Sequence, residues 1–428
     1  MNNIKNVPEI RFKGCYDKDG NWMAFTHPWE QRKVLDLLEL LTDYDANGSF
    51  ADMAKNINTT DGDGYAWYVR ITDLENPKPL SELKYVDESS YEFLKKTELH
   101  GGELLMAKRG NIGKVYIFEP RTKYATVAPN MYLLKLNNKV IPHFLYDYFV
   151  SEEGNKKLTR LNASSTMGAL YKDDVKNIDV IMPSIEEQAM IGNFFQSIDH
   201  IITLHQRKVD AYERFKEGMV QKLFSQEVRF KADDGSEFPE WEEKKLGEVF
   251  KISTETNGDR YSKQEVLSVS DEYGVVNQIE LQGRSFAGND ISKYKVVKTG
   301  QLIYTRSPLA TKPFGIIKRV GEKIGIVSPL YIVNDVKENN CSMFWYYNFD
   351  TPERTNNYLK PLVRMGAKHT MNISNEEWLS GKVLSPCLAE QQKIAKCLSS
   401  LDNVIDSEKA KVAVLKKLKK FMLQKMFV

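Results

Sequence analysis

The 428-residue sequence has few cysteines, no long apolar run and little net charge. Its four cysteines form no Cys-x-x-Cys pair, which argues against a zinc knuckle or dithiol redox site and fits a reducing cytoplasm. No run approaches 18 apolar residues, and the first residues lack the apolar core of a signal peptide, so we expect no membrane association. A net charge of +2 neither identifies nor excludes a nucleic-acid binder, because binding depends on local patches.

Catalytic motifs are also missing. Residues 109–115, RGNIGKV, lack the glycine and hydroxyl positions of a Walker A loop, so a turn between two strands is the better interpretation. The six histidines show no metal-ligand spacing. Asp73 with Glu82-Leu83-Lys84 loosely resembles a metal-nuclease pattern, but a salt-rich surface explains it more simply. No Asn-Pro-Pro-aromatic or Asp-Pro-Pro-aromatic tetrad of amino methylation occurs, so the sequence favours a non-catalytic protein without a metal site.

The sequence does contain an internal repeat. PSIEEQAMIGNFFQSID, from Pro183, resembles PCLAEQQKIAKCLSSLD, from Pro386. Residues 183–225 align with 386–428 without a gap, and 14 of the 43 positions are identical. Ordinary residue usage gives about three identities, so the similarity indicates a duplication.

Both copies predict long helices. Apolar residues recur every three or four positions and neither copy has an internal proline, which is typical of a coiled coil. Ser184 and Glu187 predict a capping box at the first helix start, whereas Cys387 stands at that position in the second copy. We expect the helices to pack antiparallel through Ile191, Phe195, Ile198, Ile202, Val209, Ile394, Leu398, Leu401, Ile405 and Val412.

Each apolar stripe skips one position at the same register, where His205 and Glu408 stand. In an antiparallel pair these mid-helix residues could face each other and fix the register. The alternative is that both point to solvent at a stutter in the stripe.

The rest of the chain forms two blocks that echo each other. WEQRKV (from Trp29) matches WEEKKL (from Trp241), GELLMAKR (from Gly102) matches GQLIYTR (from Gly300), and HFLYDYF (from His143) matches MFWYYNF (from Met343). β-Branched and aromatic runs predict strands in each block. We therefore expect an α+β chain of two mixed α/β domains alternating with two helices, with bounds 1–182, 183–225, 226–385 and 386–428.

Basic and polar residues gather at matching turns and loops of the two blocks. Arg and Lys can read guanine edges, Asn can read adenine, and Ser and Thr are more permissive. The alternative is that these are solvated turns. The candidate DNA-contacting residues are Lys108, Arg109, Asn111, Lys114, Ser165, Thr166, Arg306, Ser307, Thr311, Lys312, Lys368 and His369.

The order block–helix–block–helix, the paired Pro-x-x-x-Glu-Gln segments and the Trp-Glu-x-x-Lys entries resemble the specificity subunit of type I restriction–modification systems. The resemblance covers essentially the whole chain. It implies two target recognition domains, each reading one half of a bipartite, asymmetric double-stranded DNA sequence. It also implies two helices that separate the domains with pseudo-two-fold symmetry and dock modification (methyltransferase) subunits.

The resemblance further implies that restriction (motor and nuclease) subunits join, and that S-adenosylmethionine and ATP are bound by partners, with no cofactor on this chain. Two alternatives remain: a stand-alone DNA methyltransferase or nuclease, and a two-armed scaffold for proteins. The second repeat carries six lysines and no acid from Lys411 onward, which suits either a solvated face or contact with DNA or an acidic partner.

Overall fold

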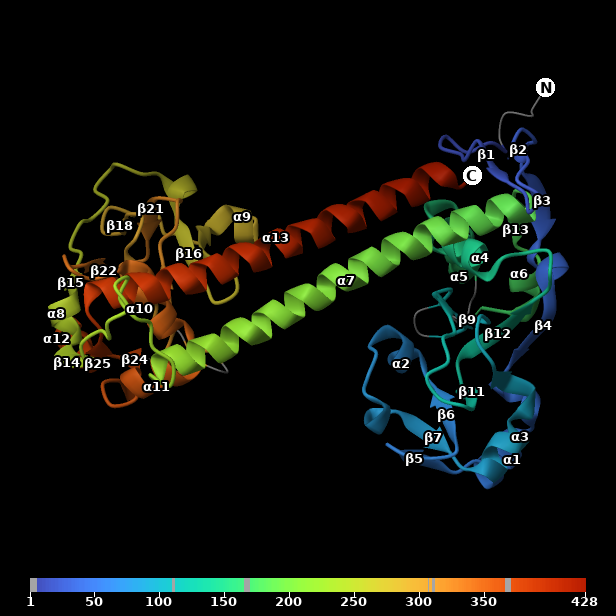
Figure 1. Ribbon diagram of the computed structural model, residues 1–428, viewed down its shortest axis with the longest axis horizontal. Coiled ribbons are helices and arrows are strands. Elements are labelled where there is room, and N and C mark those ends of the chain that lie inside the picture. Colours follow the sequence, from blue (N-terminus) through green and yellow to red (C-terminus); the bar gives the residue numbers. More distant parts are fainter. Residues whose placement is uncertain (1–5, 110–111, 165–169, 307, 310–311, 366–370) are drawn as a thin grey trace. The chain divides into compact units, whose positions relative to one another are not determined.

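Two long helices run through the repeated segments. They are α7 (Ile185–Phe224) and α13 (Leu388–Met426), drawn in green and red in Figure 1. The computed structural model describes residues 6–109, 112–164, 170–306, 308–309, 312–365 and 371–428. Both helices begin directly after a Pro-x dipeptide of the repeat, as the sequence pattern predicts.

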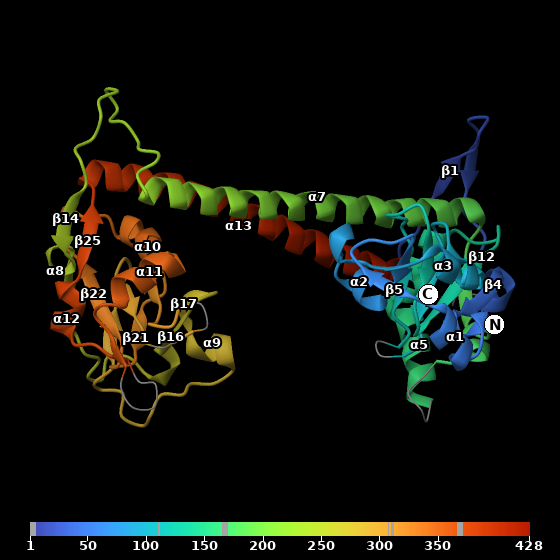
Figure 2. The same ribbon diagram turned by 90° about the horizontal axis from the view of Figure 1, so that it is seen from below.

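The chain forms two units, and each unit takes part of both helices. The first unit comprises Met1–Gln206 and Ala410–Val428, and the second comprises Arg207–Lys409. The first unit therefore holds the start of α7 and the end of α13, whereas the second holds the end of α7 and the start of α13. Within each unit the two helix segments lie side by side and antiparallel, which confirms the predicted architecture (Figures 1 and 2).

The first unit contains two main sheets. One has the strand order β10 (Val115–Ile117), β9 (Leu104–Ala107), β12 (Met131–Leu136) and β4 (Leu38–Asp43). The other has the order β5 (Thr59–Asp61), β7 (Lys84–Val86), β6 (Ala66–Val69), β11 (Ala125–Val127) and β8 (Glu98–Leu99). Two-stranded pairs join β1 (Gly14–Tyr16) to β2 (Trp22–Ala24) and β3 (Glu30–Lys33) to β13 (Asp179–Met182). The helices are α1 (Phe50–Asn56), α2 (Ile71–Glu75), α3 (Glu88–Phe93), α4 (Pro142–Val150), α5 (Glu152–Ser164) and α6 (Lys172–Lys176).

The second unit repeats the four-stranded sheet. Its order is β20 (Ile317–Arg319), β19 (Leu302–Tyr304), β22 (Ile332–Val336) and β15 (Phe250–Ile252), the same as in the first unit. Two-stranded pairs join β14 (Glu242–Lys245) to β25 (Lys382–Ser385), β16 (Leu267–Ser270) to β17 (Gly274–Asn277), β18 (Lys295–Val297) to β21 (Gly325–Val327), and β23 (Arg364–Met365) to β24 (Met371–Asn372). The helices are α8 (Leu246–Val249), α9 (Gln278–Gln282), α10 (Ser342–Asp350), α11 (Pro352–Leu359) and α12 (Asn375–Ser380).

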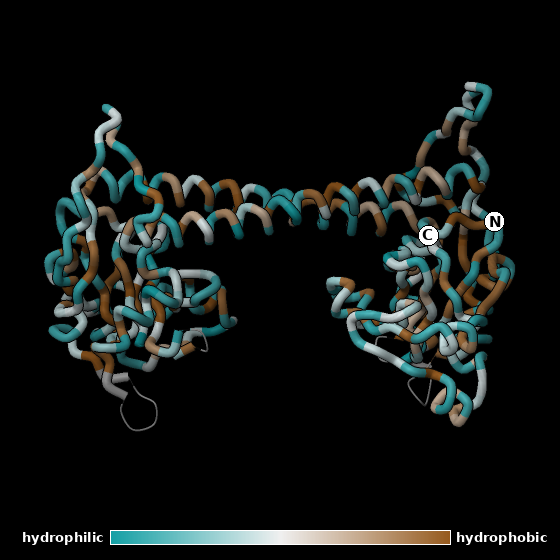
Figure 3. Tube along the Cα trace, turned by 60° about the horizontal axis from the view of Figure 1, so that its bottom comes forward, coloured by the Kyte–Doolittle hydropathy of each residue, from teal (hydrophilic) through white to brown (hydrophobic). Residues whose placement is uncertain are grey.

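Each unit builds its largest core from a domain and both helices. In the first unit, Trp29 packs edge-on against Phe427, just beyond α13, with ring centroids 6.3 Å apart. In the second unit, Trp241 packs in the same way against Phe224 at the end of α7, at 6.4 Å. Phe224 and Phe427 occupy equivalent repeat positions, so each domain closes over the end of the helix that does not follow it in sequence. Apolar and polar positions alternate along both helices (Figure 3).

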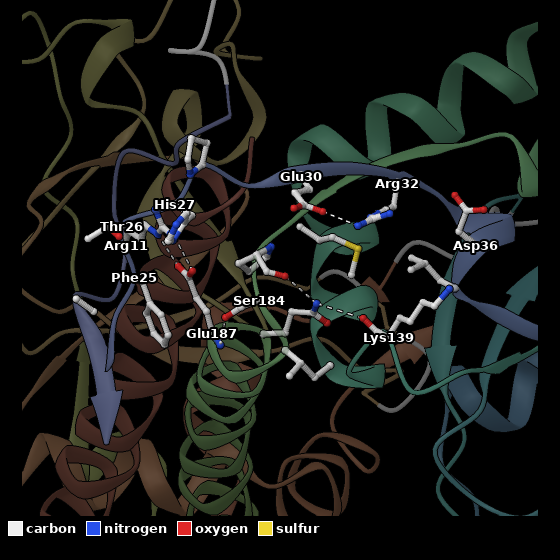
Figure 4. A pocket seen from close by; sticks show the side chains of 17 residues that line it. Arg11, Phe25, Thr26, His27, Glu30, Arg32, Asp36, Lys139, Ser184 and Glu187 are labelled. Atoms are coloured by element: carbon white, nitrogen blue, oxygen red, sulfur yellow. Dashed lines mark hydrogen bonds and ion pairs between the residues drawn. The ribbon is translucent and has the colours of Figure 1, made fainter. Parts of the chain in front are cut away.

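A buried ion pair fixes the start of each long helix to its domain. The Arg11 guanidinium donates two hydrogen bonds of 2.7 Å to the Glu187 carboxylate, which is almost fully buried beside a cavity of about 740 Å³ (Figure 4). Arg229 binds Glu390 equivalently, at 3.1 and 2.9 Å. The predicted capping box is thus only half formed. The Ser184 hydroxyl accepts a 3.5 Å bond from the Glu187 amide, but the Glu187 carboxylate binds Arg11 because a charged partner binds more strongly than a backbone amide.

The glutamine of each Glu-Gln dipeptide binds the start of a second, shorter helix to the first turn of the long helix. Gln188 accepts a hydrogen bond from the Ile141 amide at the start of α4 and donates to the Pro183 carbonyl. Gln391 accepts from the Cys341 amide at the start of α10 and donates to the Pro386 carbonyl. These bonds explain the repeated Pro-x-x-x-Glu-Gln pattern as a structural joint.

Ion pairs between the helices follow the repeat as well. Lys419 of α13 binds Asp199 of α7 at 2.7 Å in the first unit. Lys216 of α7 binds Asp402 of α13 at 2.5 Å in the second unit. The backbone repeats a contact too: the Ile10 amide donates to the Lys425 carbonyl at 3.0 Å, and the Val228 amide donates to the Lys222 carbonyl at 3.2 Å.

The joint predicts a large and non-additive effect of substitution. We expect Arg11→Met to destabilise the protein by about 3–5 kcal/mol, because it leaves the buried Glu187 carboxylate without its cation. The double variant Arg11→Met/Glu187→Met should recover much of that loss. Arg32→Met, which breaks an exposed pair with Glu30, serves as the control and should cost less than about 1 kcal/mol. Chemical denaturation measures the three changes, and a double variant no more stable than Arg11→Met would contradict the assignment.

One buried carboxyl distinguishes the first unit from the second. Asp147 of α4 is 2% exposed, and burial raises its pKa to about 8, with Asp199 adding to the effect and Lys419 opposing it. The equivalent residue in α10 is Tyr347, whose hydroxyl donates to Asp402 at 2.5 Å. Of these two equivalent positions, only that of Asp147 therefore carries a group whose pKa lies near neutral pH.

This difference predicts a pH-dependent stability. Between about pH 4 and pH 8 folded Asp147 keeps a proton that the unfolded chain releases, so the free energy of unfolding falls as pH rises, by up to about 1.4 kcal/mol per unit. Asp147→Asn should remove that slope and be more stable than wild type at pH 8.5 but not at pH 5. Tyr347→Phe, the matched control, should change stability equally at both pH values. Thermal unfolding at the two pH values checks this, and an unchanged slope in the Asn variant would refute it.

Candidate nucleic-acid interface

Matching turns join equivalent strands of the two four-stranded sheets. Residues 108–114 connect β9 to β10, and residues 305–316 connect β19 to β20. The RGNIGKV segment therefore lies at a strand–strand turn, as predicted, and not in a strand-to-helix phosphate loop. The two turns have the same place in their sheets but different side chains.

In the first turn, a carboxylate cluster neutralises Lys108. Its ammonium group binds Asp43 at 2.8 Å and Asp45 at 2.6 Å, and Lys172 binds Asp43 from the other side at 2.9 Å. Burial favours the neutral form of Asp43, but the two lysines outweigh it and lower the Asp43 pKa. These contacts give Lys108 a structural role in holding the turn to β4. Its predicted contact with DNA stays a prediction.

The neighbouring candidates in this turn are more accessible. Arg109 is exposed at the outer part of the turn. Lys114 binds Glu75 at 2.7 Å and lies over the Tyr116 ring at 5.7 Å, with about half of its side chain exposed. Among the described cations of this turn, Arg109 is exposed and has no ion pair to a described carboxylate, so it can meet a ligand from solvent.

In the second turn a carboxylate binds Lys312, whereas the described residues place no carboxylate on Arg306. Lys312 is buried and binds Asp271 at 2.6 Å, and Lys318 binds both Asp271 and Asp350. Arg306 lies two residues after the end of β19, with a left-handed backbone φ of 56°. Seven further candidates lie outside the described residues, and their DNA contacts stay predictions: Asn111, Ser165, Thr166, Ser307, Thr311, Lys368 and His369.

The predicted helix-packing residues are divided between the two units. In the first unit Ile191, Phe195 and Ile198 are buried in the main core, Ile202 packs at its edge, and Val412 is buried. In the second unit Ile394 and Leu398 lie in the main core, Leu401 packs against it, and Val209 and Ile405 are buried. Glu408 is buried and His205 is half-buried. Their pairing stays a prediction that a double-mutant cycle tests.

The described part of the chain offers no obvious catalytic centre. No group of three His, Cys, Asp or Glu side chains suited to a metal ion occurs among the described residues. Asp73, part of the nuclease-like pattern, is buried and binds Arg70 at 2.7 Å at the start of α2. Among these residues no helix combines the length and apolar character needed to cross a membrane.

The sequence analysis did not identify the carboxylates that bind some of the candidate cations. Asp43 and Asp45 at the end of β4 neutralise the first turn, and Asp271 neutralises part of the second. The two acids follow the leucine-rich run at 37–41, which is a signal for Asp43 and Asp45, but no local signal marks Asp271. The sequence analysis also did not identify Lys295, whose ammonium group binds the Tyr331 carbonyl close to the end of β19.

Comparison with known proteins identifies the family that has this architecture. A family model described as the type I restriction modification DNA specificity domain matches residues 27–213 and 239–417. The chain belongs to this specificity family. Each of the two matches includes one of the four-stranded sheets and most of one of the two duplicated segments, as expected for a duplicated specificity protein.

Two relatives from Methanocaldococcus jannaschii support the membership. The MjaX type I restriction enzyme specificity subunit is 26% identical, covering 92% of this chain and 91% of the relative. The MjaVIII specificity subunit is 24% identical, covering 74% and 76%. A crystal structure of a type I restriction–modification S subunit from M. genitalium has the same fold, with a TM-score of 0.58, 13% identity and 99% coverage of both chains.

Proposed function

We propose that each unit reads one half of a bipartite DNA target through the turn regions of its four-stranded sheet. The observation that carries this proposal is the repeated sheet with unlike turns. Lys108 is neutralised and Arg109 exposed in one turn, whereas Arg306 lacks a carboxylate among the described residues in the other. Equivalent scaffolds with different loop chemistry suit two different half-sites. The target recognition domains span residues 1–182 and 226–385 in this proposal.

We further propose that this chain recognises DNA and leaves chemistry to its partners. The missing methylation tetrad and nuclease constellation support this division. Methyl donor and ATP would then be bound by modification and restriction subunits in the cytoplasm, with no cofactor on this chain. Methyl transfer by the purified chain alone would support the alternative of a stand-alone enzyme.

The helices offer a docking surface for the modification subunits. On α13, Val414, Leu418 and Phe421 recur at spacings of four and three, so they lie on one face, and their exposed fractions are 64%, 43% and 48%. On α7, Tyr212 and Phe215 are likewise exposed. Exposed large apolar residues in a row are costly without a partner. The two helices would therefore set the spacing of the half-sites and hold the methyltransferase subunits.

The first prediction of this proposal concerns half-site recognition. Arg109→Ala should lower the discrimination against wrong bases in one half of the target by about 1–3 kcal/mol. Recognition of the other half should not change, because each base contact belongs to one domain. Mapping genome methylation in cells that carry the chain with its partners identifies the target and its change. Lys123→Ala, an exposed cation of the same domain outside the turn, is the control. Relaxation of both halves would contradict the assignment of one domain to one half.

The second prediction concerns assembly. Leu418→Ser and Phe421→Ser should each weaken binding of the methyltransferase subunit about tenfold or more, because each removes an apolar side chain from the contact. Phe50→Ser, which alters a 91% exposed phenylalanine on α1, is the matched control and should have no effect. Mass photometry of the mixed subunits measures assembly. Equal assembly of all variants would remove this face as the docking site.

A further inference from the structure

Arg306 is held in a strained backbone conformation. Its φ of 56° lies in the left-handed region, which costs a non-glycine residue roughly 1–2 kcal/mol. The turn around it is tight: a Cβ on Gly315 would come within 3.1 Å of the Arg306 amide nitrogen, and the Tyr304 hydroxyl donates to the Phe314 carbonyl. Strain of this kind persists where the surrounding structure fixes it, and it gathers at ligand sites.

One donor atom of the Arg306 side chain also lacks a partner among the described residues. Its Nε atom is shielded from solvent and has no hydrogen-bond acceptor among the described residues. No ion pair joins its guanidinium to a carboxylate in the described part of the chain. A buried donor left unpaired costs about 1–3 kcal/mol, so Arg306 combines backbone strain with an unmet hydrogen bond.

A second cation lies near the end of β19, on Lys295 of β18. The Lys295 ammonium group donates a 2.6 Å hydrogen bond to the carbonyl of Tyr331, whose neighbour Ile332 is paired with Tyr304 at the end of β19. No ion pair joins this ammonium group to a carboxylate among the described residues. Burial, and then the nearby charge of Arg306, lower the pKa of Lys295. Two neighbouring positive charges repel each other, and a neutral carbonyl offsets this repulsion only slightly.

Other half-buried cations of these turns are neutralised. Lys108 has Asp43 and Asp45, and Lys312 has Asp271. Lys298, three residues from Lys295, binds Glu255 at 2.5 Å. Arg306 and Lys295 thus differ from the cations around them.

We propose that Arg306 and Lys295 together form a binding site for one phosphodiester group of DNA. This inference rests on the proposed DNA recognition and assigns the pair to the backbone of the DNA and not to a base. A full negative charge offsets the repulsion between the two cations, whereas a neutral guanine edge does not. The guanidinium can donate to two phosphate oxygens at once, and the ammonium adds a point charge.

The test uses the full chain assembled with its methyltransferase subunits. Its affinity is measured at several salt concentrations for a duplex carrying the methylation-mapped target and for a scrambled duplex. Lys295→Met should weaken binding to both duplexes by the same factor, about five- to twentyfold, and lower the salt slope by about one. Lys298→Met removes the same charge from a neutralised site and should change neither affinity nor slope.

A second variant separates binding from folding. Arg306→Gly removes the guanidinium and permits the left-handed φ, so the DNA-free protein should be at least as heat-stable as wild type while binding both duplexes more weakly. Unchanged affinity in both variants would overturn the inference. A loss confined to the target duplex would also overturn it, because that result marks a base contact. A wild-type complex that bound both duplexes equally would instead refute the proposed DNA recognition itself.

Discussion

The buried pair of a guanidinium and a carboxylate at the start of each long helix is the contact on which the rest of the structure depends. Arg11 with Glu187, and Arg229 with Glu390, hold an N-terminal segment of each domain against the first turn of a helix. The adjacent glutamines bind the starts of α4 and α10 to the same turn. Each pair is buried, and each arginine donates two hydrogen bonds to its glutamate. The two bonds fix the orientation of the domain segment on the helix as well as its position. Each four-stranded sheet can keep a constant position and orientation relative to the start of its helix only if this joint is rigid.

The joint also explains why some features of the sequence repeat and others diverge. The Arg-Phe, Trp-Glu, Pro and Glu-Gln elements recur because both units need the same contacts between a domain and two antiparallel helix segments. The turns after β9 and β19 make none of these contacts, so their side chains are free to differ. The residues of each turn divide in the same way: carboxylates bind Lys108 and Lys312, whereas no ion pair to a carboxylate occupies Arg109 or Arg306 among the described residues.

The helices, their antiparallel packing and the strands flanking both turns could be predicted from sequence, because apolar periodicity and the repeat are local signals. The sequence could not predict which of the cations are paired with carboxylates. Lys108 meets Asp43 and Asp45 across 65 and 63 residues, and this approach depends on the order of β4, β12 and β9 in the sheet. The capping box of Ser184 and Glu187 was half wrong for the same reason, since Arg11 reaches Glu187 across 176 residues. The strain at Arg306 depends on the closure of its turn at Gly315.

The reciprocal placement of Phe427 and Phe224 has a consequence for synthesis of the chain. The second unit is one continuous stretch, Arg207–Lys409, and can complete its core as soon as that stretch has left the ribosome. The first unit needs Leu423, Met426 and Phe427 to cover Trp29 and Phe144. Its apolar surface therefore waits for more than 200 later residues, and the domain made first is the one that finishes folding last.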